Sequence, residues 1–266
     1  MTGQDSIIEL LTRAPLMLPL FALVLMRISG IMLTAPIYGS SAVPARIRAG
    51  LAVTIAFVMF PTVAPQLPTE VSLATALPGA FGELLIGLII GLTLSLVFAG
   101  VQLAGMVIGQ QAGLALGQVF NPVLNTQTTI LGQTFFLTAL TVFVIVGGHR
   151  ELMRALLDTY ATIPVLSFRA GEETLTLVTD VLTGTYALGM RMAAPVLIAL
   201  LIGTLVMGFL SRTMPQLNIL SVGFPIRALM ALCVAGFVLA ASGGLMIDAL
   251  DDVLVRLRLA LAGGKA

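Results

Sequence analysis

Few residues in this sequence could carry out covalent chemistry. The chain has one histidine, His149, and one cysteine, Cys233. As a catalytic base, His149 would need an orienting acid and a nucleophile, and nearby Glu151 would not share a helix face with it. No Gly-Lys-Ser/Thr phosphate-binding motif occurs. We therefore expect no enzymatic activity, no metal site and no cofactor, and we interpret His149 as an interfacial structural residue and Cys233 as packing.

A neutral polar segment is the most unusual part of the chain. Glycines recur every four residues at Gly105, Gly109, Gly113 and Gly117. In a helix they would line one face and let a neighbouring backbone approach closely. Amide side chains in lipid must find partners or water. Two interpretations stay open, namely tight helix packing with amide hydrogen bonds, or a neutral loop that lines or closes a pore. The other residues of the segment are Gln102, Gln110, Gln111, Gln118, Val119, Phe120, Asn121 and Pro122.

Two charged residues interrupt apolar sequence near the N-terminus. Arg27 lies inside an apolar run, where a charge is costly unless it has a partner or a polar cavity. Glu83 precedes a second apolar run, so it either stabilises the N-terminal end of a helix or pairs with Arg27 in a polar site. Together they would suit the midplane site of a small-molecule secondary transporter, although that class has internal repeats and we find none.

The composition requires helices that are covered by something other than water. Of 266 residues, 58% are hydrophobic and 9% are charged, with a mean hydropathy of +1.09. Soluble domains carry about 25% charged residues, so the composition excludes a soluble enzyme. Intrinsic disorder is excluded as well, because it requires low hydrophobicity. A net charge of +1 gives no basic field for nucleic acid. The chain is an integral membrane protein, or a subunit whose apolar surface other subunits cover.

Six apolar segments approach the roughly 20 residues that cross a bilayer. The arginine asymmetry between their ends, seven basic residues against four, is too weak to orient conventional spans. The acidic N-terminal sequence argues against a cleavable signal peptide. The expected segments cover residues 14–33, 49–67, 84–104, 129–147, 192–210 and 228–247.

Residues 149–180 differ from the spans because they hold eight charged residues. They predict a water-accessible helical hairpin that Pro164 interrupts, with Arg154 and Asp158 paired on its exposed face. Residues 248–266 are predicted to form an amphipathic C-terminal segment. No tandem repeat or linker is present, so residues 1–266 are expected to form a single domain.

Four segments, in this order, resemble the FliR family, a subunit of the flagellar type III export gate whose injectisome counterpart is the SctT family. They cover nearly the whole chain. The neutral third segment is more similar to the flagellar version. The segments are RISGIMLTAP (Arg27 to Pro36) with VPARIR after it, GELLIGLIIG (Gly82 to Gly91), GQQAGLALGQVFNP (Gly109 to Pro122) and SRTMPQLNILSVGFPIR (Ser211 to Arg227).

The resemblance implies an all-α fold of hydrophobic helical hairpins packed into a multi-subunit helical export gate. It implies a non-catalytic subunit that assembles with FliP-family and FliQ-family chains beside FlhB-family and FlhA-family neighbours. The location would be the flagellar basal body in the bacterial inner membrane, in contact with lipid, and the cargo unfolded flagellar subunits.

The resemblance also assigns roles to residues of this chain. A loop that plugs the closed channel would fall on Gly109 to Pro122, with Phe120 as an inward-pointing stopper. We expect buried polar or assembly roles for Arg27, Glu83, Arg212, Pro215, Gln216, Asn218 and Arg227.

Overall fold

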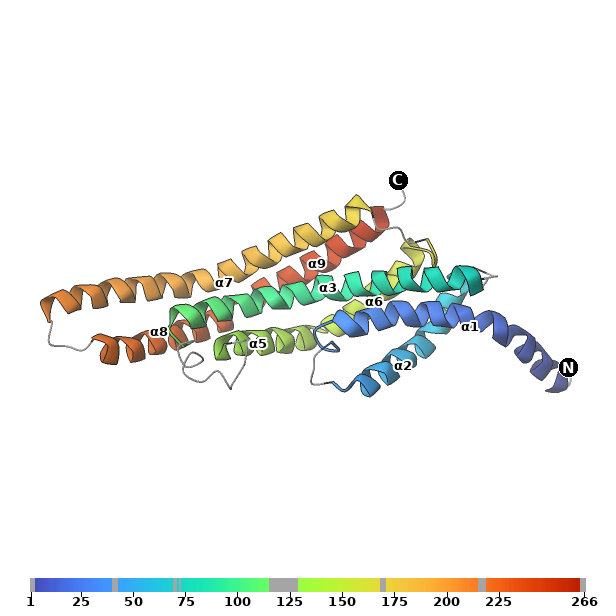
Figure 1. Ribbon diagram of the computed structural model, residues 1–266, viewed down its shortest axis with the longest axis horizontal. Helices are drawn as coiled ribbons and strands as arrows, with labels where there is room; N and C mark the ends of the chain where they lie inside the picture. Colours follow the sequence, from blue (N-terminus) through green and yellow to red (C-terminus); the bar gives the residue numbers. More distant parts are fainter. Residues whose placement is uncertain are drawn as a thin grey trace. The chain divides into compact units, whose positions relative to one another are not determined.

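The computed structural model describes residues 3–39, 43–68, 71, 73–114, 129–167, 171–214 and 219–263 (Figure 1). Within these ranges the secondary structure is helical and contains no β-strand, which confirms the predicted all-α class. The described helices are α1 (Gly3–Thr34), α2 (Ala45–Val63), the 3-10 turn η1 (Ala64–Gln66), α3 (Leu73–Gln111), α5 (Ile130–Val146), α6 (Gly148–Thr162), α7 (Glu172–Thr213), α8 (Ile219–Ala241) and α9 (Gly243–Gly263).

Apolar helices long enough to cross a membrane correspond to the predicted segments, but two are much longer. In the described ranges five helices qualify, and α5 with α6 forms a bent pair that would make a sixth. The predicted segment 84–104 lies inside α3, and 192–210 lies inside α7, which has 42 residues. At 1.5 Å per residue, α7 contains about 60 Å of helix, twice the thickness of a hydrocarbon core.

Several predicted helix boundaries are confirmed, and one is wrong. Helix α6 ends before Pro164, and α7 begins at Glu172, as the sequence indicates. The predicted span 228–247 is interrupted, because α8 ends at Ala241 and α9 begins at Gly243. Since the apolar run continues through this break, hydropathy alone did not reveal it. Whether the 149–180 hairpin is in water stays a prediction.

The described chain divides into two compact units, and α3, α7 and α9 continue from one into the other. The first unit comprises Met1–Ser95, His149–Thr179 and Val253–Ala266, and the second comprises Leu96–Gly148 and Asp180–Asp252. The predicted single domain stays a prediction.

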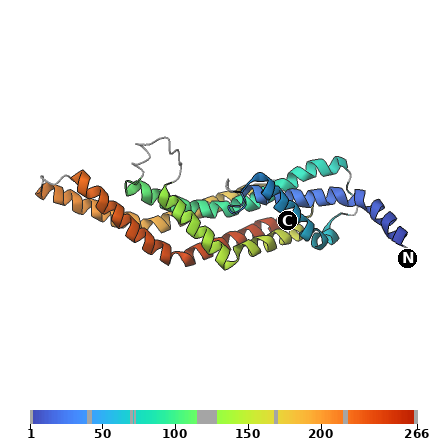
Figure 2. The same cartoon turned by 90° about the horizontal axis from the view of Figure 1, so that it is seen from below.

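In the first unit, α1 packs against α2 and against the N-terminal half of α3. Phe21 of α1 meets Phe60 of α2 edge to face, with ring centroids 5.7 Å apart. Side chains of α1 such as Leu23, Val24 and Ile28 are completely or almost completely buried. Both views place α1 and α3 side by side (Figures 1 and 2).

In the second unit, the remainder of α3 packs against α5 and α7. Phe98 of α3 lies edge to face with Phe143 of α5, at 5.5 Å between ring centroids. Gly100 of α3 lies so close to Thr185 of α7 that a Cβ on the glycine would overlap its backbone. Helices α7 and α8 also run side by side, which Figures 1 and 2 show in orange and red-orange. Their outer surfaces are largely apolar and exposed.

Candidate functional site

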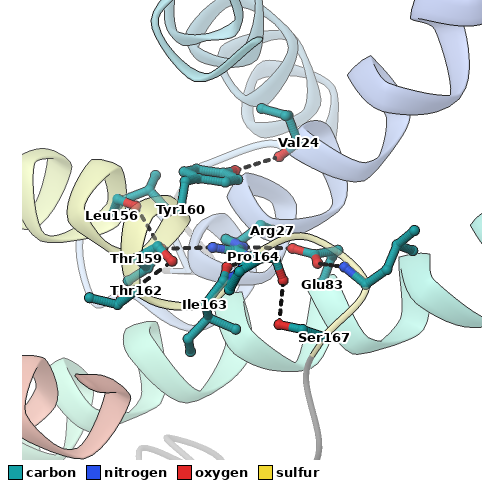
Figure 3. A network of polar contacts seen from close by, with 11 residues as sticks. Val24, Arg27, Glu83, Leu156, Thr159, Tyr160, Thr162, Ile163, Pro164 and Ser167 are labelled. Atoms are coloured by element: carbon teal, nitrogen blue, oxygen red, sulfur yellow. Dashed lines mark hydrogen bonds and ion pairs between the residues drawn. The ribbon is translucent and has the colours of Figure 1, made fainter. Parts of the chain in front are cut away.

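The Arg27–Glu83 ion pair is the centre of the most extensive polar network that the structure describes (Figure 3). Arg27 of α1 donates from Nε to Oε2 of Glu83 on α3 at 2.6 Å, and both side chains are 0% exposed. Arg27 thus has the partner that its place in an apolar helix requires. Glu83 does not stabilise a helix N-terminus, because α3 begins ten residues earlier at Leu73.

Helix α6 supplies the next contacts of the arginine. Nη1 donates to Thr159 Oγ1 at 3.0 Å, and Nη2 donates to the carbonyl oxygen of Ile163 at 3.2 Å. The guanidinium carbon lies 4.1 Å from the ring centroid of Tyr160, within cation–π range. The Tyr160 hydroxyl donates in turn to the carbonyl oxygen of Val24 on α1 at 3.3 Å. The network therefore joins α1, α3 and α6 on three sides of one arginine.

The second carboxylate oxygen of Glu83 holds the turn that follows α6. Oε1 accepts the backbone N–H of Leu166 at 3.0 Å. Leu166 has a φ of 71°, a left-handed conformation that leucine rarely adopts. It occupies the third position of a turn closed by Ser167 N–H donating to the Pro164 carbonyl at 3.1 Å. Glycine usually fills this position in a type II turn, so the carboxylate hydrogen bond stabilises an otherwise unfavourable backbone.

This arrangement offers no binding site for a small molecule at Arg27 and Glu83. Both side chains are fully buried, and each guanidinium nitrogen already donates to a protein acceptor. A transported solute would need access to at least one of these groups. No observation supports the transporter alternative.

Glycines next to the ion pair allow the α1 and α3 backbones to touch. A Cβ on Gly30 would lie 2.6 Å from the Leu88 nitrogen, and one on Gly87 would lie 2.9 Å from the Arg27 carbonyl carbon. Thr34 Oγ1 donates across the same contact to the Leu88 carbonyl at 3.2 Å. The close crossing places Arg27 and Glu83 within reach of each other.

Part of the glycine-rich segment packs as its spacing predicts. A Cβ on Gly105 would lie 2.5 Å from the Leu131 carbonyl oxygen of α5, and one on Gly109 would lie 3.1 Å from Thr129. Thr129 caps α5 by accepting the Gly132 N–H at 3.0 Å. Gly105 and Gly109 therefore support the tight-packing interpretation.

The helical spacing of these glycines ends before Gly113. Helix α3 stops at Gln111, and Gly113 has a φ of 81°. Its N–H donates to Gln110, and Leu114 N–H donates to Gly109, both at 3.0 Å. This pair of bonds is a Schellman motif, in which glycine avoids the steric cost of a left-handed conformation. The helical packing interpretation therefore applies to Gly105 and Gly109 and not to Gly113.

The predicted plug residues fall on both sides of this helix end. Gly109 is buried, Gly113 is half-buried, and the amides of Gln110 and Gln111 are exposed. The remaining predicted plug residues, Gly117, Gln118, Val119, Phe120, Asn121 and Pro122, lie outside the described residues.

The predicted assembly residues outside the ion pair are only partly described. Arg212 is exposed at the end of α7, and Arg227 is half-buried on α8. Pro215, Gln216 and Asn218 lie outside the described residues. The network does not include Arg212 or Arg227.

Other predicted features differ in detail. Arg154 forms an ion pair with Glu151, three residues earlier on the same helix, and its pairing with Asp158 stays a prediction. Cys233 is exposed on α8, so its interpretation as packing within this chain is wrong. His149 is half-buried, and its Nδ1 has no hydrogen-bond partner among the described atoms. No group of three His, Cys, Asp or Glu side chains in the described ranges could hold a metal.

Sequence reasoning missed Thr159, the Ile163 carbonyl and the Leu166 N–H. Thr159 carried a weak signal, since it lies one turn beyond Leu156 and two turns beyond Leu152 on the buried stripe of an amphipathic helix. The Ile163 carbonyl and the Leu166 N–H carried no sequence signal, because every residue type has a backbone carbonyl and nearly every one has a backbone N–H.

Comparison with known proteins extends over most of the chain. Residues 18–253 match the family described as bacterial export proteins, family 1. Flagellar biosynthetic protein FliR of Escherichia coli is 33% identical over 76% of this chain and 77% of its own. FliR of Bacillus subtilis is 32% identical over 79% of this chain and 82% of its own. The Yop proteins translocation protein T of Yersinia pestis is 29% identical over 70% of this chain and 72% of its own.

Proposed function

We infer that this chain, which belongs to the family of bacterial export proteins, family 1, is a non-catalytic subunit of the flagellar type III protein export gate. The observation that carries the inference is the match over residues 18–253 together with relatives named for flagellar biosynthesis and for protein translocation. The long apolar helices fit a subunit of a membrane-associated assembly.

A flagellar role is supported over an injectisome role by the charge pattern of the central segment. The identities alone do not separate the two roles, since flagellar relatives range from 27% to 33% and the Yop translocation protein is 29% identical. The segment between Leu84 and Gly148 has no charged residue, in keeping with the flagellar version of the resemblance. We place the protein in the basal body at the inner membrane, with unfolded flagellar subunits as its cargo.

The partners proposed for the gate are FliP-family and FliQ-family subunits, with FlhB-family and FlhA-family neighbours. The exposed apolar side chains of α7 and α8 support an assembled state, because soluble monomers rarely expose such large apolar surfaces. Exposed Phe209 and Phe237 are examples, at 70% and 75%. We propose no chemical reaction for this chain, because the description of its family names protein export and no reaction.

The plug of the closed gate is proposed to lie at Gly109 to Pro122, with Phe120 as the stopper. The two helices that flank the proposed plug come together at one place, since Gly109 near the end of α3 lies close to Thr129 at the start of α5. The plug's freedom from charge suits a conduit for cargoes of varied sequence.

Deletion of Gly113 to Phe120 tests the plug. We expect an assembled gate that leaks, measured as an increased ion conductance in lipid bilayers or as uptake of a small dye by cells. The double variant Gln110→Ala/Gln111→Ala, which keeps the segment, serves as the control and should stay closed. A deletion variant with its full complement of partner subunits and wild-type conductance would refute the plug assignment.

A further inference from the structure

Beyond Asp180 the α7–α8 pair carries arginines but no acidic residue. From Val181 to Ile247 the sequence contains Arg191, Arg212 and Arg227, and no Asp, Glu or Lys. None of the three arginines makes an ion pair within the described parts of the chain. An arginine on an apolar surface needs a compensating group when that surface is covered, and the described residues of this chain supply none to these arginines.

A lipid bilayer is too thin to cover the whole exposed face of α7. In the second unit, exposed apolar side chains run from Leu182 to Met214. These 32 residues of separation correspond to about 48 Å of helix. A 30 Å hydrocarbon core accommodates about 39 Å of helix even at a tilt of 40°. The hydrocarbon core alone therefore does not cover the whole of this face, which leaves room for a protein contact on it.

Arg227 lies within the apolar zone rather than at its edge. A Cβ on Gly203 of α7 would lie 2.9 Å from Met230 Cε of α8, so these two residues lie at about the same level of the two antiparallel helices. Arg227 comes three residues before Met230, level with Val206 and about 9 Å short of Arg212 along α7. Exposed apolar side chains occur near this level on both helices, with Val206 of α7 exposed at 53% and Phe224, one turn before Arg227 on α8, at 42%.

We propose that the α7–α8 face docks an apolar helix of a neighbouring gate subunit, and that Arg227 recognises a carboxylate within that helix. The proposal rests on the proposed function, because it specifies the chemistry of one gate partner. A bilayer spanning the 20 uncharged residues between Arg191 and Arg212 would place Arg227 in hydrocarbon, away from lipid phosphates. A carboxylate from a partner helix supplies the missing charge at that depth.

Charge reversal at Arg227 is the test. The tagged full-length chain is expressed with the other gate subunits, and the partner subunits recovered per tagged chain in mild detergent are quantified. We expect Arg227→Asp to recover less than about a tenth of the wild-type amount, because two carboxylates then face each other in a dehydrated contact. Arg227→Lys keeps the charge and should recover at least half. Arg150→Asp, an exposed change on α6, is the matched control and should recover the wild-type amount.

A second measurement separates lost recognition from misfolding. Every Asp and Glu in the apolar helices of the co-expressed partners is changed to Lys in the Arg227→Asp background, and one of these reversals should restore recovery. A photo-crosslinker at Phe224, which is exposed one turn before Arg227 on the same helix, should label that same partner helix in the otherwise wild-type chain.

Three results would overturn the proposal. They are wild-type recovery by Arg227→Asp, failure of every partner reversal to restore it, and cross-linking at Phe224 to lipid alone. Absence of gate subunits from the wild-type sample is a different result, since it contradicts the proposed function itself.

Discussion

The buried Arg27–Glu83 pair makes each of its partners dependent on the other. Removal of one member leaves an uncompensated charge in an interior where neither side chain contacts water, and that situation costs about 3–5 kcal/mol. The extra hydrogen bonds to Thr159, Ile163 and Leu166 extend the dependence to α6 and to the turn after it.

Arg27→Met should therefore destabilise the protein strongly, and Arg27→Met/Glu83→Gln should recover a large part of the loss. The double variant removes both charges, while the glutamine amide oxygen can still accept the Leu166 N–H. The midpoint of thermal unfolding in mild detergent measures both effects. Arg154→Gln removes an exposed ion pair and should change stability by no more than about 1 kcal/mol. Equal midpoints for Arg27→Met and Arg154→Gln would contradict the importance of burial.

Sequence reasoning predicted that Arg27 needs a charged or polar partner, but it did not predict the full set of contacts around the pair. An arginine inside an apolar run requires a partner, and Glu83 was a candidate. The contacts to Thr159 and to the Ile163 carbonyl join residues more than 130 positions apart, which helical periodicity cannot specify. The left-handed Leu166 was also unpredictable, because its stabilisation comes from a carboxylate 83 residues away.

Helix elements meet in this fold through glycine-lined crossings. At the α1–α3 crossing a Cβ would overlap main-chain atoms that cannot move without shifting a whole helix. Gly87→Ala should cost about 1–3 kcal/mol as an overpacking change. Gly50→Ala on α2 is the matched control, because nothing lies within 4 Å of its Cβ position. It should be neutral or stabilise by up to about 1 kcal/mol through helix propensity.

Thermal unfolding of the two glycine variants checks this difference. If Gly87→Ala is as stable as Gly50→Ala, the close approach of α1 and α3 does not hold in the folded protein. A second consequence is local, since a displaced crossing would separate Arg27 from Glu83.

Element boundaries were predictable where the chain has a strong local signal. Pro164 and the Gly171-Glu172 step correctly marked the end of α6 and the start of α7. Hydropathy windows did not give the full extent of α3 and α7, because both helices continue into less apolar sequence. Four-residue glycine spacing indicated close packing at Gly105 and Gly109 but not the left-handed turn at Gly113, where the same residue type has a different use.

At the scale of the whole molecule, the composition reflects surfaces that other molecules cover. Hydrophobic residues make up 58% of the chain, and many large ones on α7 and α8 are exposed. Sequence alone cannot separate lipid-facing from partner-facing positions, because both favour the same apolar side chains. The exposed length of α7 separates them in part, since it exceeds what a bilayer covers.

The central claim is that this chain functions only as part of a multi-subunit export gate. The most direct measurement is purification of the tagged full-length protein from its native cells in mild detergent, with mass-spectrometric identification and quantification of the small hydrophobic proteins that accompany it. The account predicts FliP-family and FliQ-family subunits in a fixed ratio to the tagged chain. Recovery of a stable monomer free of these subunits would contradict it.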